Sequence, residues 1–181
     1  MPFAVAALLL SAGAVAGSLY LSLEMDLKAC TLCFYQRAFA FGLVGVLGVG
    51  VLAFREYAAR LCLVALPLAI GGLGVAGFHV WLGWIDWPRE QATWYLACPD
   101  GIGGHGTAPQ QSLAIFGLIT TVLLIGAVGE VIVSGRGGLA FLASWALGVA
   151  AAAGSVLANP PMADPKPLPP PPLITCQPTP R

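Results

Sequence analysis

The residues of this chain that could do chemistry are its cysteines, and two of them form a Cys-x-x-Cys pair. Cys30 and Cys33 lie in the stretch "ACTLCFYQR", residues 29–37. Two cysteines at this spacing close a small ring on oxidation, which suits a reversible redox pair, although structural disulfides and zinc sites also use it. A zinc site would want a second closely spaced pair of ligands, and the sequence has none. The spacing therefore favours redox activity.

Arg37 follows Cys33 by four residues, so the two share one face of a helix. We expect this helix to begin near Cys33, where its dipole favours a thiolate. An arginine one turn inside an apolar segment is costly, which indicates a functional role. It could hold a thiolate or an anionic reduced ligand; the other interpretation is a side chain that snorkels to the membrane surface.

The composition indicates a membrane protein. Of the 181 residues, 58% are hydrophobic and 9% are charged, with a formal net charge of zero. A soluble domain carries about 25% charged residues, so most of this surface does not face water. The neutral balance also argues against nucleic acid as a partner, because such binding needs a basic stripe.

Five apolar stretches are long enough to span about 30 Å of hydrocarbon. They lie at about 3–23, 34–54, 61–85, 112–133 and 138–158. The first has no Lys or Arg before it and exceeds the apolar region of a typical signal peptide, so we expect a retained span. The sequence predicts an all-α protein with a transmembrane helical domain at 1–158 and a Pro-rich tail at 159–181.

The charges near the span ends predict a cytoplasmic N-terminus. Three arginines lie on one side of the membrane and two cations on the other: Arg55, Arg60 and Arg136 against Lys28 and Arg89. This is a weak positive-inside bias. It places the 24–33 loop, the 86–111 loop and the tail outside the cytoplasm.

Four of the five cysteines share that outer face when five spans are counted. They are Cys30, Cys33, Cys98 and Cys176. With four spans, Cys176 would be on the other side. Disulfides persist outside the cytoplasm, so the count suggests two redox pairs. Cys62 lies near the opposite end of the third span, and we expect an inert buried thiol there.

Two stretches carry a resemblance to a known family. "CTLCFYQR", residues 30–37, closely resembles the signature of the DsbB family, membrane enzymes that make disulfides and pass the electrons to quinone. "GFHVWLGW", residues 77–84, is similar to the end of that family's third span. The resemblance implies a four-helix bundle, to which this chain adds a fifth span. It also implies a bound quinone (ubiquinone or menaquinone), a thioredoxin-fold partner of the DsbA type, and a bacterial cytoplasmic (inner) membrane with the redox cysteines on its periplasmic face.

The same resemblance implies roles for single residues. Cys33 would face the quinone in a thiolate–quinone charge-transfer contact, and Cys30 would exchange with a second cysteine pair. Arg37 would support the quinone site. His79 matches the family's quinone-proximal histidine; its position in a span fits a functional residue and a packing residue equally well.

The chain departs from the family pattern in two places. Gly83 stands where a glutamine is common four residues after the histidine. The family carries its second cysteine pair in one loop, between the third and fourth spans, and here that loop holds only Cys98. Cys176 could supply the missing partner, because the 18 residues from Ala158 to Cys176 reach roughly 55 Å at about 3.1 Å each. The alternative is a tail whose cysteine is incidental.

The sequence thus predicts a quinone-linked thiol oxidase. A reduced partner would attack a Cys98–Cys176 disulfide, electrons would pass to Cys30–Cys33, and Cys33 would reduce the quinone. One alternative is a vitamin K epoxide reductase-like enzyme, whose motif cysteines should lie in a later span. The other is a non-catalytic membrane subunit with structural disulfides, against which Arg37 argues.

Overall fold

The computed structural model describes residues 1–24, 30–53, 57–84, 101–134 and 138–158, and this part of the chain is helical without strands. The elements are α1 (Pro2–Leu23), α2 (Thr31–Ala53), α3 (Ala58–Trp84), the 3₁₀ turn η3 (Ile102–Gly104), α4 (Ala108–Ser134) and α5 (Gly138–Leu157). The prediction of an all-α membrane protein with five spans is confirmed.

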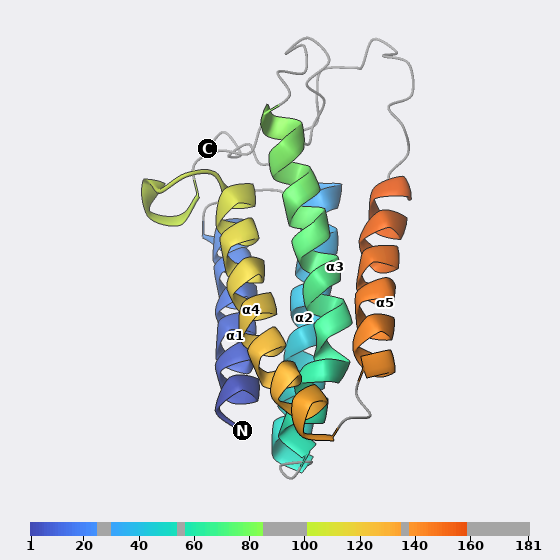
Figure 1. Ribbon diagram of the computed structural model, residues 1–181. Coiled ribbons are helices and arrows are strands. Elements are labelled where there is room, and N and C mark those ends of the chain that lie inside the picture. The colour runs from blue at the N-terminus through green and yellow to red at the C-terminus, as the bar shows by residue number, and fades with distance from the viewer. Residues whose placement is uncertain (25–29, 54–56, 85–100, 135–137, 159–181) are drawn as a thin grey trace, which may run out of the picture.

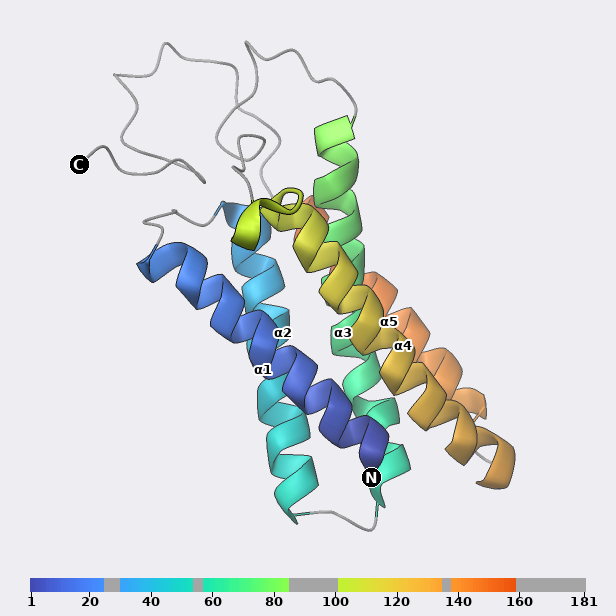
Figure 2. The same ribbon diagram turned by 90° about the vertical axis from the view of Figure 1, so that its left-hand side faces the viewer.

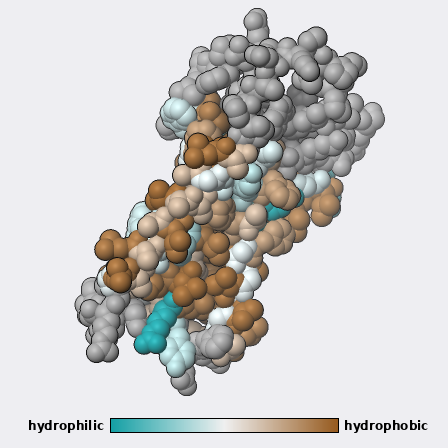
Figure 3. Space-filling model, turned by 90° about the vertical axis from the view of Figure 1, so that its right-hand side faces the viewer, coloured by the Kyte–Doolittle hydropathy of each residue, from teal (hydrophilic) through white to brown (hydrophobic). Residues whose placement is uncertain are grey.

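All five α-helices are long and apolar enough to cross a membrane. Their outward side chains are apolar along the body of the bundle, as Figure 3 shows for one face. Leu9, Leu52 and Leu139 are all mostly exposed, which lipid tolerates and water does not. Helix α4 begins at Ala108, four residues before the predicted start at 112, because the polar residues Gln110 and Gln111 form part of its first turn at the end of the bundle.

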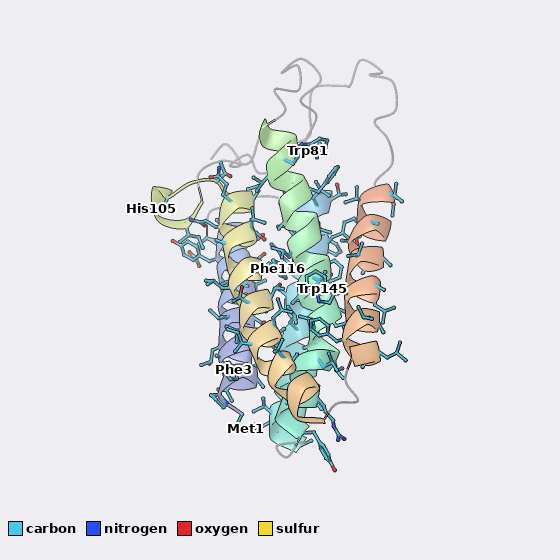
Figure 4. The ribbon with its side chains drawn as sticks, viewed as in Figure 1. Met1, Phe3, Trp81, His105, Phe116 and Trp145 are labelled. Atoms are coloured by element: carbon cyan, nitrogen blue, oxygen red, sulfur yellow. The ribbon has the colours of Figure 1, made fainter. Side chains whose placement is uncertain are left out.

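Helix α3 is the centre of the bundle and packs against α2, α4 and α5, while α1 packs against α2 and α4 (Figures 1 and 2). The largest side chains of the core come from α2, α3 and α4. They include Leu43, Leu47, Leu66, Phe116 and Leu123, all buried. Phe116 lies inside the bundle in Figure 4, and a Cβ atom on Gly72 would overlap its ring. Small residues on α3 therefore set how closely α4 can approach.

The fifth helix is joined to α3 at a break in the α3 hydrogen-bond ladder. Pro67 lies inside α3 and has no N–H, so the carbonyl of Leu63 loses its ordinary intrahelical donor. The Ser144 hydroxyl of α5 shares its proton between that carbonyl, at 3.1 Å, and the carbonyl of Ala140 in its own helix, at 2.9 Å. Close by, a Cβ on Gly148 would lie 2.6 Å from Cβ of Ile70, so the two backbones meet where α5 has no side chain. Helix α5 is thus an integral part of the bundle.

The helices alternate in direction, and one end of the bundle collects the start of α2 and the ends of α3 and α5 (Figure 1). Cys30 lies at this end, directly before α2. Cys98 and Cys176 lie outside the described residues, and so does the predicted tail at 159–181. Their pairing stays a prediction.

Candidate active site

The Cys-x-x-Cys pair lies at the first turn of α2. The carbonyl of Cys30 accepts the first intrahelical hydrogen bond, from Phe34 N–H at 2.9 Å, which makes Cys30 the N-cap residue. Its Sγ accepts a hydrogen bond from the backbone N–H of Cys33 at 3.2 Å. The two sulfur atoms lie 2.7 Å apart, so a disulfide can form with little movement of the backbone. Cys30 is buried, and Cys33 is half-buried.

A histidine from the third helix lies against this pair. His79 Nε2 is 3.9 Å from Cys30 Sγ, and both residues are almost fully buried. On its other side, His79 Nδ1 is 3.4 Å from Nε2 of Gln36, which is also buried. The partner of one ring nitrogen decides which nitrogen carries the proton. Gln36 is therefore placed to set the tautomer that His79 presents to Cys30.

Arg37 is held by the first helix. Its Nε donates to Ser18 Oγ at 2.8 Å, and its Nη2 donates to the Ser18 carbonyl at 2.9 Å and to Ser22 Oγ at 2.6 Å. The Arg37 side chain is half-buried, and its serine partners both belong to α1. These hydrogen bonds disfavour the snorkelling alternative, because a snorkelling side chain leaves its donors to water and headgroups.

A pocket of about 300 Å³ lies beside Cys33 and Arg37. Helices α1, α2 and α4 form its walls, and Ile102 of η3 contributes to its outer side. The polar lining residues are Ser18, Cys33, Gln36, Arg37, Gln111 and Ser112. The rest of the wall is apolar or glycine, including Gly13 and Gly17 of α1. A largely apolar site with a few converging polar groups is typical of small-molecule binding.

The segment before α4 forms the outer edge of the pocket, and Gln111 makes three hydrogen bonds to it. Gln111 accepts a hydrogen bond from Ile102 N–H and donates from Nε2 to the carbonyls of Ile102 and His105, each at 2.9 Å. Gly103, Gly104 and Gly106 have positive φ angles near 70°, which glycine adopts without strain. His105 lies on the outer side of this loop (Figure 4). The loop is therefore an ordered wall.

The structure brings together some of the predicted site residues and separates others. Cys30, Cys33 and His79 form one cluster, and Cys33 and Arg37 line one pocket. His79 stands behind Cys30 and is not among the residues that line the pocket. Its contact with a quinone stays a prediction.

Sequence reasoning missed two glutamines. Gln36 is an uncharged polar residue within an apolar span, and polar residues at membrane depth are rare enough to be a signal. Its contact with His79 supplies a polar neighbour from α2, whereas Gly83 of α3 can supply none. Gln111 carries no such signal in the sequence, because a glutamine at the start of a span is expected to face water.

The fold and the site together define a membrane-spanning thiol oxidoreductase, with a Cys-x-x-Cys pair at the end of a helical bundle and a largely apolar pocket beside its half-buried Cys33. The chain belongs to the DsbB family, because the family described as "Disulfide bond formation protein DsbB" matches residues 2–116. Membership supports a role in disulfide bond formation and disfavours the two alternatives above. The matched part ends within α4, so α5 lies beyond it.

Individual relatives carry the same description. The chain is 31% identical over 110 residues to the "Probable disulfide formation protein" of Chlamydia pneumoniae, which covers 60% of this chain and 79% of that protein. It is 33% identical over 110 residues to its counterpart in Chlamydia trachomatis, with the same coverage. It is 39% identical over 66 residues to "Probable disulfide formation protein C" of Bacillus cereus, covering 36% of this chain and 45% of that one. No solved structure matches the chain.

Proposed function

We propose that this chain is a quinone-linked thiol oxidase of a bacterial cytoplasmic (inner) membrane, which reoxidises a thioredoxin-fold partner of the DsbA type. The observation that carries the proposal is the position of Cys33, which both contacts Cys30 and lines a pocket that also contains Arg37. One sulfur of the pair is thus open to a small molecule while the other is buried.

The lining of the pocket fits a quinone ring. Its volume of about 300 Å³ is at the lower end of small-molecule sites and suits a ring rather than a long chain. Apolar side chains such as Ile115 and Phe116 suit a flat ring, and Arg37 supplies N–H groups for a carbonyl oxygen. When bound, a quinone supplies an acceptor for two electrons and two protons.

The chain's own residues divide the remaining tasks. Arg37 carries a positive charge that Ser18 and Ser22 hold at the pocket wall, where it stabilises an anionic sulfur or an anionic ligand oxygen. The backbone N–H of Cys33 gives the Cys30 sulfur a donor. His79, oriented by Gln36, can hold a proton next to that sulfur during thiol exchange.

The electron path begins outside the membrane. The partner's two thiols become its disulfide, and two electrons and two protons pass to a Cys98–Cys176 disulfide by exchange through a mixed disulfide. The resulting thiols then reduce the Cys30–Cys33 disulfide. This order is supported by the arrangement of the bundle, which brings the start of α2 and the ends of α3 and α5 to one end. Cys30 lies at the start of α2, and Cys98 and Cys176 follow α3 and α5 in the chain, so exchange between the two pairs requires no transfer across the membrane.

The proposal is tested with the purified full chain in detergent. A reduced thioredoxin-fold partner and a short-chain ubiquinone or menaquinone are mixed with it, and quinone reduction is followed by absorbance. We expect quinone loss equal to the partner disulfide formed. Cys62→Ser is the control for loss of a thiol outside the site and should keep the activity of the parent. Cys62 is a buried thiol far along α3 from the pocket. Partner oxidation that proceeds without any quinone consumption would contradict the proposal.

A further inference from the structure

The cluster of Cys30, Cys33 and His79 contains three metal-ligand atoms within 4.8 Å of one another. We propose that the reduced site binds a divalent thiophilic metal ion, of which Zn²⁺ is the natural example, through these three residues. This goes beyond the thiol oxidase activity, and binding of the ion requires neither the quinone nor the partner protein.

The donor set is that of a zinc site with an open position. Zinc in proteins takes Cys sulfur at about 2.3 Å and His nitrogen at about 2.0–2.1 Å, and sites with three protein ligands keep a fourth place for water. The sequence offers only one closely spaced pair, and α3 supplies the third ligand from 49 residues away in the chain. The fold therefore completes a ligand set that spacing alone does not indicate.

The distances need a small adjustment. Tetrahedral bonds of these lengths place two sulfurs about 3.8 Å apart and a sulfur and a nitrogen about 3.6 Å apart. Cys30 Sγ and His79 Nε2 are already 3.9 Å apart. The two sulfurs lie 2.7 Å apart and must separate by about 1 Å, which rotation of the half-buried Cys33 side chain can supply. Cys33 also lines the pocket, so the ion and a fourth ligand can enter from that side.

Charge balance favours a divalent ion. Two thiolates and one divalent cation sum to zero, whereas a monovalent ion would leave one negative charge beside Cys30 and His79, which are almost fully buried. Binding replaces two S–H bonds with two sulfur–metal bonds and releases two protons. A disulfide offers no thiolate, so oxidation of the pair and metal binding exclude each other.

Gln36 extends the site beyond its ligands. A metal on His79 Nε2 requires the proton to be on Nδ1, and Nδ1 lies 3.4 Å from the Gln36 amide. Turning the amide over places its oxygen there as an acceptor. Metal-ligating histidines use such outer partners, and loss of one costs about 10- to 100-fold in affinity.

The experiment uses the purified full chain with Cys98→Ser and Cys176→Ser, so that the remaining thiols are those described here. The reduced protein is titrated with Co²⁺ as a coloured probe, and Zn²⁺ is then added in competition. We expect one equivalent of Co²⁺ with thiolate-to-cobalt absorption, displaced by Zn²⁺. The oxidised protein should bind none. Gln36→Leu should weaken Zn²⁺ binding by about 10- to 100-fold.

Three variants separate this site from other thiols. Cys33→Ser and His79→Ala should each lose the thiolate-to-cobalt band or most of the affinity. Cys62→Ser, which removes a buried thiol outside the cluster, should bind as the parent does. Circular dichroism checks that each variant is folded. If His79→Ala does not fold, His79→Gln is used in its place. Equal Co²⁺ uptake by the oxidised protein, or full affinity in a folded His79 variant, would overturn the proposal, whatever the result of the quinone assay.

Discussion

Arg37 on α2 and Ser18 on α1 are joined by two hydrogen bonds, one to the serine hydroxyl at 2.8 Å and one to its carbonyl at 2.9 Å. These bonds tie the charged wall of the pocket to the first helix. A guanidinium presents donors in a fixed fork, so anchoring two of its nitrogens also fixes the direction of the third. The first helix thus takes part in the site although it holds no cysteine.

Loss of this charge should weaken quinone use more than partner binding. A hydrogen bond to a charged group contributes about 1.5–3 kcal/mol, so Arg37→Ala should lower kcat/KM for quinone by about 10- to 100-fold. Arg37→Lys should retain only part of the wild-type kcat/KM for quinone, since a lysine lacks the planar guanidinium fork. Steady-state kinetics with each substrate varied separately check this. Normal quinone kinetics with lost partner binding in Arg37→Ala would contradict the placement.

Ser18→Ala should have a smaller effect of the same kind, a several-fold rise in KM for quinone. The Ser18 carbonyl and Ser22 Oγ still hold Arg37 Nη2 in this variant. The substitution therefore removes one hydrogen bond, which contributes about 1 kcal/mol. Ser11→Ala is the matched control on the same helix, because the Ser11 hydroxyl bonds only to the carbonyl of Ala7 among the groups that the structure describes. Equal KM changes in the two variants would remove the role assigned to Ser18.

Cys33→Ser should abolish quinone reduction and leave the protein folded in the membrane. The side chain is at a helix end and half-buried, so a hydroxyl in its place costs little packing. The measurement is quinone reduction alongside gel filtration in detergent. Wild-type turnover in this variant would exclude Cys33 from the mechanism.

Filling the pocket should raise KM for quinone without unfolding the protein. Gly13 lines the pocket, and a Cβ there meets no atom within 4 Å. Gly13→Phe should therefore raise KM by about tenfold or more, as misfits in apolar pockets do. Gly45→Phe is the control, since a Cβ at Gly45 also meets no atom within 4 Å but Gly45 does not line the pocket. An unchanged KM in Gly13→Phe would show that the quinone does not bind in this pocket.

Added volume at the contact between α5 and α3 should destabilise the bundle. A Cβ at Gly148 would lie 2.6 Å from Ile70 Cβ and 3.0 Å from the Pro67 carbonyl oxygen, so Gly148→Ala should cost about 1–3 kcal/mol. Gly154→Ala, on the same helix with no atom within 4 Å, is the control. Thermal unfolding in detergent measures both. Equal stability would mean that α5 does not depend on this close contact.

Cys176 should form a disulfide with Cys98. Each lacks another assigned partner among the five cysteines, and an arrangement with five spans predicts that both lie on the side of the membrane that holds Cys30. Mass spectrometry of a digest made without reductant should show the two peptides linked. Truncation after Ala158 should leave the Cys30–Cys33 pair able to meet quinone but poorly able to oxidise the partner. Full-rate partner oxidation by the truncated chain would refute the pairing.

The helices and the Cys-x-x-Cys chemistry at the start of α2 could be predicted from the order of the residues alone. Long apolar runs must form helices in a membrane, because only internal hydrogen bonds satisfy the backbone there. The spacing from Cys30 to Arg37 likewise followed from helix geometry, since residues that lie four apart share a face. These are local properties, and neither depends on which helix is adjacent.

The partners of those residues on neighbouring helices became known from the packing of the bundle. His79 meets Cys30, Ser18 meets Arg37 and Ser144 meets the Leu63 carbonyl, in each case from a different helix. Helix periodicity gives the face of each residue but not the rotation and depth of one helix against the next. In a bilayer these are set by close packing at small residues and by single polar contacts, because lipid is as apolar as the core and supplies no general force between helices.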